Sequence, residues 1–383
     1  MATLIKPSTP SPDKAHIEHV LELIRLGDID PNLFTNARPL WHPPGARGIY
    51  GGAVIAQCLA AAQRTVPDNF TVHSMHCYFV LAGNAEIPVI YSVERVREGK
   101  SFCTRTVQAR QRGKPVFTTT LSFMREGAGG KETVSHAVKM ADDMGPPPPD
   151  DSEEGFEVRA SRGDKSGPGP FVSRRLRNLN NDSPELDKVK ARQWIKARGK
   201  ISDKGGFQAH LNAIAYMSDS YFMGTVARVH RLWRYGNQAD ANKPKDQKLL
   251  DSLPEVLKNS AINPEVLEKI QADDFDTRTR MESMMDEDVI EQLRHMKIVD
   301  GKLVQGEVRP EIAMMVSLDH TIYFHSRDFR ADEWMYSEMD SPWAANGRGF
   351  VTQKIYSKSG KLIASCVQEG VLRLKPRLGA PKL

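Results

Sequence analysis

The feature of this sequence that most restricts its fold is an internal repeat. In the first copy, Ser101-Phe102 is followed by Gly113-Lys114 and a strand-like segment. In the second copy, Arg348-Gly349-Phe350 is followed by Gly360-Lys361 and another strand-like segment. The Phe-to-Gly spacing is 11 residues in one copy and 10 in the other, and the copies lie about 247 residues apart. This order of motifs indicates that one helix-and-sheet unit was duplicated within the chain.

The first copy combines helical and strand-like patterns. The alanine-rich segment 51–66 begins with Gly51-Gly52 and predicts a helix that other structure can surround. An earlier helix is predicted to start near residue 17 and to end near Gly27, because its apolar residues follow the helical period. Segments rich in β-branched and aromatic residues predict strands at 71–81, 88–96, 101–110 and 115–124. One helix followed by four such strands points to an antiparallel sheet packed on that helix.

The second copy repeats this plan after a Pro- and Gly-rich stretch. A helix is predicted at 207–226, and strands are predicted at 192–201, 314–325, 333–340, 347–358 and 361–374. We therefore predict an α+β protein with an N-terminal unit at 15–125, a linker at 126–187 and a C-terminal unit at 188–378.

A polar insertion interrupts the C-terminal unit at about 231–308. Its apolar spacing predicts helices at 249–257 and 289–298. We interpret the insertion as an extended surface loop in preference to a functional lid, since inserts of this kind usually lengthen loops.

The composition excludes several classes of protein. Hydrophobic residues make up 40% and charged residues 26% of the 383 residues, which excludes a mostly disordered chain. No apolar run approaches the roughly 18 residues that a membrane span needs. Residues 1–14 lack the apolar core of a secretory signal, so we expect a soluble intracellular protein. The net charge of +5 is mild and suits a small polyanionic ligand at least as well as a nucleic acid.

Several catalytic mechanisms lack their motifs here. There is no G-x-S-x-G for a serine nucleophile and no H-E-x-x-H for zinc. The four cysteines are far apart and form no C-x-x-C, so neither a metal site nor a disulfide framework is indicated. The segment that ends in Lys100-Ser101 has Glu94 where a phosphate-binding loop requires glycine. The strand histidines, among them His320, are interpreted as hydrogen-bonded core or edge residues.

An ordered set of motifs resembles the type II acyl-CoA thioesterases. The resemblance covers about residues 17–125 and 190–375. It rests on Gly51-Gly52, Val72-His73-Ser74-Met75-His76, Gly99-Lys100-Ser101-Phe102, Arg112-Gly113-Lys114-Pro115, Ser317-Leu318-Asp319-His320, Arg348-Gly349-Phe350 and Val367-Gln368-Glu369-Gly370-Val371. The resemblance implies a double hotdog fold, in which each half wraps a long helix in an antiparallel sheet.

The resemblance also implies an activity and a set of catalytic residues. The activity is hydrolysis of medium- or long-chain fatty acyl-CoA to free fatty acid and CoA, with neither a cofactor nor a metal. The family's catalytic Asp, Thr or Ser, and Gln correspond to Asp219, Ser317 and Gln368. Ser317 stands where many members carry threonine, and both residues supply the hydroxyl.

The three residues suit water activation on chemical grounds. Asp219 is predicted within a partly apolar helix face, where desolvation raises the pKa of a carboxyl toward that of a general base. Gln368 shares a predicted strand face with Ala364 and Cys366, so its amide would be buried and could hold a water. A buried amide that only ties backbone groups together is equally compatible with the sequence. Ser317 could orient the water, although a hydroxyl at a strand start commonly has no such role.

Binding of the thioester oxygen and of the CoA phosphates needs further groups. Backbone N–H groups at Gly51 and Gly52 start a helix and could stabilise negative charge on the thioester oxygen. Cations near the opening would contact the phosphates, and the weaker candidates for this role are Arg47, Arg97, Lys100 and Arg348. Ordinary solvated charge is the more common role for each of these four taken singly.

Two rival functions remain open from the sequence. A hotdog hydratase or dehydratase would need an Asp-His or Glu-His pair, but the adjacent Asp319 and His320 should point to opposite faces of their strand. A catalytically silent acyl-CoA binding protein would not require Asp219, Ser317 and Gln368 together.

The surroundings of the protein can also be inferred. The C-terminal Pro381-Lys382-Leu383 is similar to the peroxisomal address Ser-Lys-Leu. Together with the resemblance to eukaryotic peroxisomal members, this favours a peroxisomal location over a cytoplasmic one. Because one double-hotdog chain imitates a hotdog dimer, further pairing into a homodimer or higher homo-oligomer is also expected.

Overall fold

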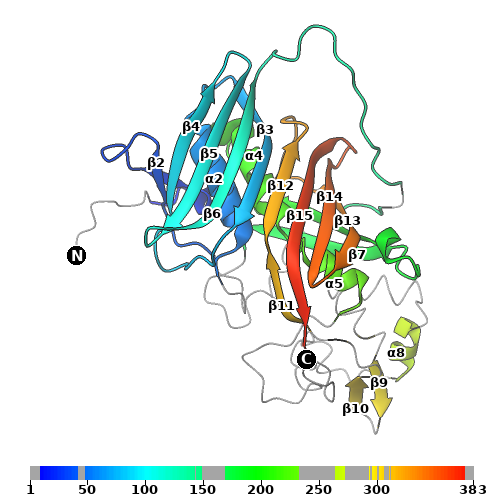
Figure 1. Cartoon of the computed structure of the whole chain (residues 1–383). Coiled ribbons are helices and arrows are strands. Elements are labelled where there is room, and N and C mark those ends of the chain that lie inside the picture. Colours follow the sequence, from blue (N-terminus) through cyan, green and yellow to red (C-terminus); the bar gives the residue numbers. More distant parts are fainter. Residues whose placement is uncertain are drawn as a thin grey trace.

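A computed structural model describes residues 9–41, 48–142, 144–148, 169–232, 264–271, 293, 296–299, 302–305, 310 and 312–375. Within these residues the architecture is one sheet of 13 strands curled around two helices (Figure 1). The strand order is β1-β2-β4-β5-β6-β3-β12-β15-β14-β13-β8-β7, and β11 pairs with β15 beside this path. Every pairing is antiparallel, as expected for strands joined by short turns.

The N-terminal half contributes the first six strands and the first central helix. Its helices are α1 (His16–Val20) and α2 (Gly51–Gln63). Its strands are β1 (Leu23–Arg25), β2 (Leu33–Asn36), β3 (Phe70–Phe79), β4 (Ile90–Glu98), β5 (Phe102–Gln111) and β6 (Lys114–Arg125). Every residue of α2 from Gly52 to Gln63 is buried, which agrees with the small, apolar surface predicted for this helix.

The C-terminal half repeats the arrangement around the second central helix. Its helical elements are η2 (Leu186–Lys188), η3 (Asp203–Gly205), α4 (Gly206–Ser218), α5 (Gly224–Val229) and α8 (Pro264–Gln271). Its strands in the main sheet are β7 (Phe171–Leu179), β8 (Lys190–Ala197), β11 (Ile312–Ser317), β12 (Asp319–Phe324), β13 (Met335–Ala345), β14 (Arg348–Ser357) and β15 (Leu362–Leu374). A separate hairpin consists of β9 (Met296–Val299) and β10 (Lys302–Gln305).

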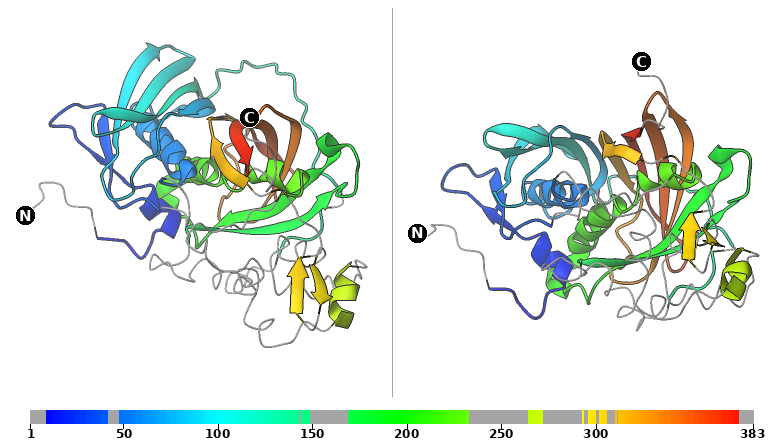
Figure 2. Two further views of the ribbon diagram at one scale, coloured as in Figure 1. Left: turned by 60° about the horizontal axis from the view of Figure 1, so that its bottom comes forward. Right: turned by 90° about the horizontal axis from the view of Figure 1, so that it is seen from below.

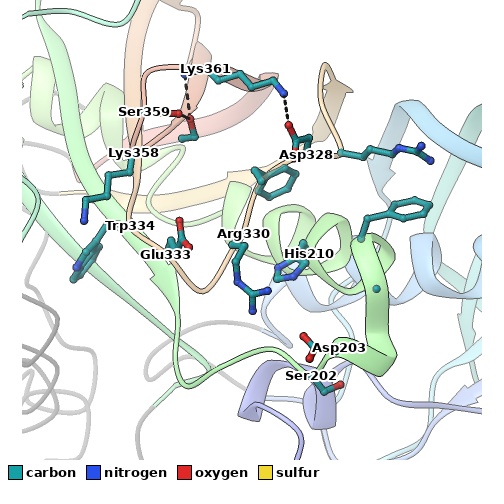
Figure 3. Close-up of a pocket in the computed structure, with 15 residues that line it drawn as sticks. Ser202, Asp203, His210, Asp328, Arg330, Glu333, Trp334, Lys358, Ser359 and Lys361 are labelled. Carbon is teal, nitrogen blue, oxygen red and sulfur yellow. Dashed lines mark hydrogen bonds and ion pairs between the residues drawn. The ribbon is translucent and has the colours of Figure 1, made fainter.

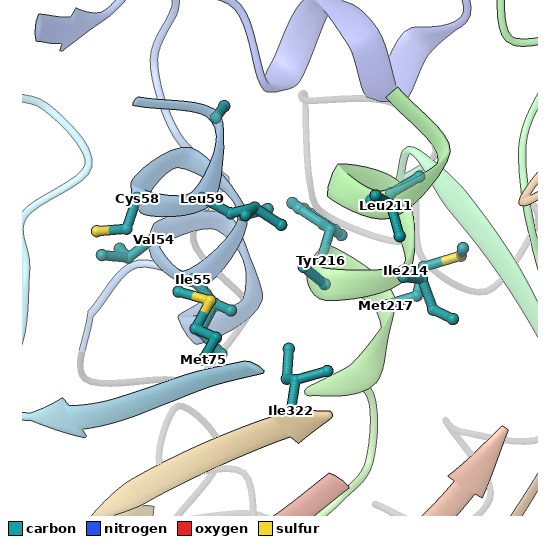
Figure 4. Close-up of a cluster of buried hydrophobic side chains, with 14 of the residues drawn as sticks. Val54, Ile55, Cys58, Leu59, Met75, Leu211, Ile214, Tyr216, Met217 and Ile322 are labelled. Carbon is teal, nitrogen blue, oxygen red and sulfur yellow. The ribbon is translucent and has the colours of Figure 1, made fainter. Parts of the chain in front are cut away.

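The two halves join through β3 and β12, which pair along the middle of the sheet. The sheet therefore continues from one half into the other, and α2 and α4 lie side by side inside its curve (Figure 2). Buried side chains fill the space between these helices and the two joining strands (Figure 4). Leu59 and Tyr216 lie on the helices, while Met75 and Ile322 lie on β3 and β12. No helix among the described residues is both long and apolar enough to cross a membrane.

Three predicted elements end or break earlier than expected. The first helix stops at Val20, because the following residues form β1 and pair with β2. The helix predicted at 207–226 breaks after Ser218, where Asp219 caps α4 and Tyr221 adopts a left-handed φ of 57°. The strand predicted at 314–325 divides at Leu318 into β11 and β12. The second of these breaks places Asp219 at a helix end and not in a helix interior.

The predicted linker is also shorter than expected. Residues 171–179, assigned to the linker at 126–187, form β7 and pair with β8. Val172 explains this, because it packs in a small outer apolar cluster with Trp194 and Trp334. In the insertion, residues 296–298 belong to a strand although they were predicted to end a helix, and the helix predicted at 249–257 lies outside the described residues.

Candidate active site

The end of α4 meets the start of α2, and Asp219 lies at this junction. The Gly52 N–H donates to Asp219 Oδ2 at 3.0 Å, and the Tyr50 hydroxyl donates to the Tyr216 carbonyl oxygen at 3.0 Å. Glycine is required at both helix-start positions. A Cβ on Gly52 would overlap the Tyr216 carbonyl oxygen, and one on Gly51 would lie 2.7 Å from Asp219 Oδ2. The Gly-Gly pair therefore allows the two helix ends to touch.

The three residues expected to act together come from three separate elements. Asp219 caps α4, Ser317 ends β11, and Gln368 lies on β15 with no exposed surface. The Gln368 Nε2 donates to Ser317 Oγ, and the same side chain hydrogen-bonds to Asp219. The fold thus brings all three together in one hydrogen-bonded cluster.

The environment of Asp219 changes its acidity. Burial raises the pKa of this carboxyl from 3.8 to about 7, while hydrogen bonds from Gly52 and Gln368 oppose the rise. Desolvation is therefore the dominant effect, as the apolar helix face suggested. A carboxyl with a pKa near 7 can accept a proton at neutral pH and release it again, which is the property of a general base.

Ser218 and His320, which the sequence did not assign to the site, also belong to this hydrogen-bond network. His320 Nδ1 lies 2.6 Å from Gln368 Oε1, and His320 Nε2 lies 2.9 Å from Ser218 Oγ. His320 has no exposed surface, which confirms its interpretation as a hydrogen-bonded core residue. Its neighbour Asp319 accepts from the Glu369 N–H at 2.6 Å. The motif Ser317-Leu318-Asp319-His320 was the available signal, but strand alternation alone did not show which partner His320 meets.

The two predicted backbone donors at the start of α2 differ. The N–H of Gly52 is used by Asp219, so it is not available to a thioester oxygen while that bond persists. This corrects the expectation that both groups are available. Among the described residues, the Gly51 N–H has no hydrogen-bond partner.

One of the predicted phosphate-binding cations, Arg348, lies on β14 beside β15, the strand that carries Gln368. Arg348 Nη1 lies 2.7 Å from Glu369 Oε1, next to Gln368 in the chain, and its guanidinium lies over the Trp343 ring. Glu369 follows Gln368 in the strand, so this ion pair lies on the opposite face of the sheet from the buried Gln368 side chain. Arg47 lies outside the described residues.

Arg97 and Lys100 lie toward the far end of the N-terminal sheet. Phe79, whose ring adjoins Gly51, pairs with Phe117 of β6. Phe117 pairs with Ala109 of β5, and Ala109 pairs with Tyr91 of β4, so Tyr91 lies at the same level of the sheet as Phe79. Arg97 is six residues further along β4, which is about 20 Å at roughly 3.3 Å per residue. Lys100 lies beyond it, in the turn after β4. Neither residue is brought near Asp219 within this chain.

A pocket of about 660 Å³ lies at the opposite end of α4 (Figure 3). Phe207 and His210 line it from the first turns of α4, and Arg330 and Lys358 line it from the loops around them. Asp219 caps the other end of this helix, about 20 Å away at roughly 1.5 Å per residue. The pocket is therefore separate from the hydrogen-bonded cluster. In the described part of the chain, no group of three or more His, Cys, Asp or Glu residues could hold a metal ion.

Comparisons with known proteins match both halves. The acyl-CoA thioesterase N-terminal domain matches residues 38–124, and the acyl-CoA thioesterase C-terminal domain matches residues 128–372. Acyl-coenzyme A thioesterase 8 from Homo sapiens is 29% identical, with 95% of this chain and 92% of the relative covered. The peroxisomal acyl-coenzyme A thioester hydrolase 1 from Saccharomyces cerevisiae is 24% identical, with 93% and 94% covered.

Solved structures support the predicted fold. The acyl-CoA thioesterase II TesB2 from Mycobacterium marinum aligns with a TM-score of 0.56 at 25% identity, and 95% of this chain and 99% of that chain are covered. A hot dog fold protein from Alicyclobacillus acidocaldarius aligns with a TM-score of 0.51 at 14% identity, over 94% and 98% of the two chains. The expected double hotdog is confirmed by these likenesses and by the sheet around α2 and α4.

Proposed function

Because this chain belongs to the acyl-CoA thioesterase family and is a thioester hydrolase, we propose that it hydrolyses medium- and long-chain fatty acyl-CoA with a water activated by Asp219, Gln368 and Ser317. The resemblance to the type II members is confirmed by the family models and by the TesB2 likeness. The acyl-chain range rests on that resemblance alone. The observation that carries the proposal is the Asp219–Gln368–Ser317 cluster, in which Gln368 is buried, Asp219 and Ser317 are partly buried, and the carboxyl has a pKa of about 7.

In the proposed mechanism, Asp219 takes a proton from water while the water oxygen attacks the thioester carbonyl carbon. The Ser317 hydroxyl holds the water in line with that carbon, and Gln368 holds Ser317 and Asp219 in place. The Gly51 N–H, which has no hydrogen-bond partner among the described residues, stabilises the charge that develops on the carbonyl oxygen. The C–S bond then breaks, and the proton held by Asp219 passes to the departing CoA sulfur. The fatty acid and CoA leave with no covalent acyl-enzyme and no metal.

The proposal is tested by thiol release from a series of saturated acyl-CoA chain lengths. Replacing Asp219 with Asn keeps the shape but removes the base, so we expect kcat to fall by about 10²–10⁴-fold while acyl-CoA still binds. The matched control is Asp328→Asn, which removes an exposed carboxylate in another part of the fold and should leave kcat unchanged. Wild-type kcat in Asp219→Asn would contradict the assignment of this base, and Asp319 would be examined next.

The rival functions make different predictions in the same assay. A hydratase would add water to an unsaturated acyl-CoA without releasing thiol, and a silent binding protein would release none from any substrate. The contacts weigh against the hydratase, because Asp319 bonds the Glu369 backbone while the buried His320 bonds Gln368. The two side chains therefore do not form one acid–base pair.

We further propose a peroxisomal location. The yeast relative named as peroxisomal supports this, and the C-terminal tripeptide lies outside the described residues. The test is imaging of an N-terminally tagged protein, in which Lys382→Glu should disperse a punctate signal into the cytoplasm.

We also propose that chains pair into a homodimer. Tyr78 and Tyr323 support this, because they are exposed large apolar side chains on the adjoining strands β3 and β12. Light scattering after size exclusion would give a monomer mass if this is wrong.

A further inference from the structure

A buried chain of hydrogen bonds continues behind the proposed catalytic residues. Ser218 Oγ lies 2.9 Å from His320 Nε2, and His320 Nδ1 lies 2.6 Å from Gln368 Oε1. Ser218 is 1% exposed and the other two residues are 0% exposed, so water cannot substitute for any of these partners. The mechanism uses Gln368 but does not explain why its side chain has a histidine behind it.

We infer that His320, held by Ser218, is a positioning residue that fixes the orientation of the Gln368 amide. This inference rests on the proposed function, because it concerns how Gln368 presents its two N–H groups to Asp219 and Ser317. It assigns His320 no contact with the substrate.

One assignment of the donors and acceptors orients the Gln368 amide toward Ser317 and Asp219. A glutamine amide has an oxygen that accepts and an NH₂ group that donates twice. When His320 Nδ1–H donates to Gln368 Oε1, both amide N–H groups face the other side, toward Ser317 Oγ and Asp219. A neutral imidazole carries one N–H, so Nε2 is then an acceptor that needs the Ser218 hydroxyl proton. That hydroxyl also lies 3.0 Å from the Ala215 carbonyl oxygen and can donate to only one of the two at a time. In this arrangement Ser218 donates to His320 in preference to Ala215, and so supports the tautomer that orients Gln368.

The reversed amide would oppose the proposed reaction. Its oxygen would face Asp219, so two acceptors would meet whenever the Asp219 carboxyl is ionised, which is the form that acts as the base. Its NH₂ group would face His320 Nδ1, which would require the other tautomer. Phe222 closes the space beside the imidazole, with ring centroids 5.3 Å apart, so His320 is held in place by packing as well.

The titrating groups around the cluster make the consequence measurable. Burial raises the pKa values of Tyr50, Tyr216 and Cys77 above their ordinary ranges, and burial lowers that of His320 to about 4. Asp219 is thus the group of this set that titrates near neutral pH. The Gln368 hydrogen bond lowers its pKa. Loss of the amide orientation should therefore move the pH–rate midpoint upward.

The test compares His320→Leu with His210→Leu in the full-length protein. His210 is a matched control, because it is also a buried imidazole, and its Nδ1 accepts from the Ala331 N–H away from the site. In His320→Leu we expect kcat to fall about tenfold or more and the midpoint of kcat/KM against pH to rise by about half a unit, with KM little changed. His320→Asn, which retains a donor near the position of Nδ1, should recover part of kcat.

A second pair of measurements applies if His320→Leu does not fold. Ser218→Ala should shift the midpoint in the same direction by a smaller amount, and ¹⁵N NMR of the wild-type imidazole should report the Nδ1–H tautomer. The Nε2–H tautomer, or a wild-type pH midpoint in both His320→Leu and Ser218→Ala, would overturn the inference. Asp219→Asn is measured alongside. If that variant is inactive while the His320 and Ser218 variants keep the wild-type profile, the positioning inference alone fails. If Asp219→Asn keeps wild-type kcat, the proposed mechanism, in which Asp219 is the base, fails.

Discussion

The two central helices are alike in length and start, but their ends differ in chemistry. Both α2 and α4 have 13 residues, and α4 ends at Asp219 where α2 ends at Arg64. Around Asp219, the pairing of β12 with β15 brings His320 beside Gln368. At the corresponding place in the N-terminal half, Met75 lies opposite Leu121, and both are fully buried. The duplication has thus kept the scaffold in both halves and the polar cluster in one.

Each end is stable for a different reason. Arg64 donates to the Leu23 carbonyl oxygen at 2.9 Å and lies over the Phe34 ring, so its charge is satisfied at the edge of an apolar core. The cluster around Asp219 buries several polar groups, which is tolerable only because they hydrogen-bond to one another. The contrast indicates that burying the polar side chains of a catalytic cluster costs free energy. One copy of the scaffold folds without such a cluster.

The largest effect is expected from exchanging the two cap residues for amides. Asp219→Asn should lower kcat by about 10²–10⁴-fold, because it removes the proton acceptor. Arg64→Gln, at the equivalent cap of α2, should leave kcat within about threefold, because the contacts of Arg64 with Leu23 and Phe34 contribute to stability and not to the reaction. Steady-state thiol release at saturating acyl-CoA measures both. A comparable loss of kcat in Arg64→Gln would show that both helix ends take part in the reaction.

The next largest effect is on the pH dependence of stability, to which Asp219 and His320 contribute with opposite sign. Asp219 has its folded-state pKa raised from 3.8 to about 7, so its contribution to stability is present below pH 3.8 and is lost as the pH rises to 7. His320 has its pKa lowered from 6.5 to about 4, so its contribution is present above pH 6.5 and is lost as the pH falls to 4. Between pH 4 and 6.5 the two slopes oppose each other, and wild-type stability receives little net slope from this pair.

Removing either group should reveal the other. As the pH rises from 4 to 6.5, the free energy of unfolding of Asp219→Asn should increase by about 3 kcal/mol, because His320 still titrates. As the pH rises from 4 to 7, the free energy of unfolding of His320→Asn should decrease by about 4 kcal/mol, because Asp219 still titrates. Both figures use about 1.4 kcal/mol per pKa unit. Urea unfolding at several pH values measures this, and subtraction of the curve for the Asp219→Asn/His320→Asn double variant removes the other titrating residues. Parallel curves for all three proteins would show that neither pKa is shifted as described.

Most helices and strands could be predicted, because they follow from the local spacing of apolar residues in the sequence. The alternation in the segments that became β3 to β6 and β13 to β15 fixed their type, and the Gly-Gly start located α2. The break at Asp219 could not be read, because the apolar spacing continues through residues 222 and 226 while the chain turns at Tyr221. β7 was hidden in an Arg-rich stretch whose apolar contacts, Trp194 and Trp334, are distant in sequence.

The sequence predicted which residues carry the chemistry of the site, but not which side chains contact one another there. Asp219, Ser317 and Gln368 were identified through motif order, and burial of Gln368 followed from strand alternation. The roles of Ser218 and His320 depend on which side chains meet across α4, β12 and β15, and that is set by tertiary packing. For the same reason the sequence placed Arg97 and Lys100 near the site, although both lie at the far end of their sheet.

A reciprocal exchange tests whether the two halves have become specialised. The double substitution His320→Met with Gln368→Leu gives the C-terminal half the apolar pair of the N-terminal half, so it should lower kcat by about 10²-fold with little loss of stability. Leu121→Gln buries an amide beside Met75, which offers no partner, and should destabilise the fold by about 2–4 kcal/mol. Kinetics and urea unfolding of both variants provide the comparison. Equal destabilisation by the two exchanges would contradict the assigned roles.

The smallest effect concerns the hydroxyl at the end of β11. Ser317 accepts from Gln368 Nε2, so Ser317→Ala leaves one amide N–H without its partner and removes a hydroxyl that orients the water. We expect kcat to fall by about tenfold, which corresponds to about 1.4 kcal/mol, the scale of one hydrogen bond. Ser317→Thr keeps the hydroxyl and should retain kcat within a few-fold, because Ser317 is only partly buried and an added methyl group can be accommodated. If Ser317→Ala and Ser317→Thr lose activity equally, the space at this strand end matters more than its hydroxyl, and the cluster that distinguishes the two halves is reduced to Asp219 and Gln368.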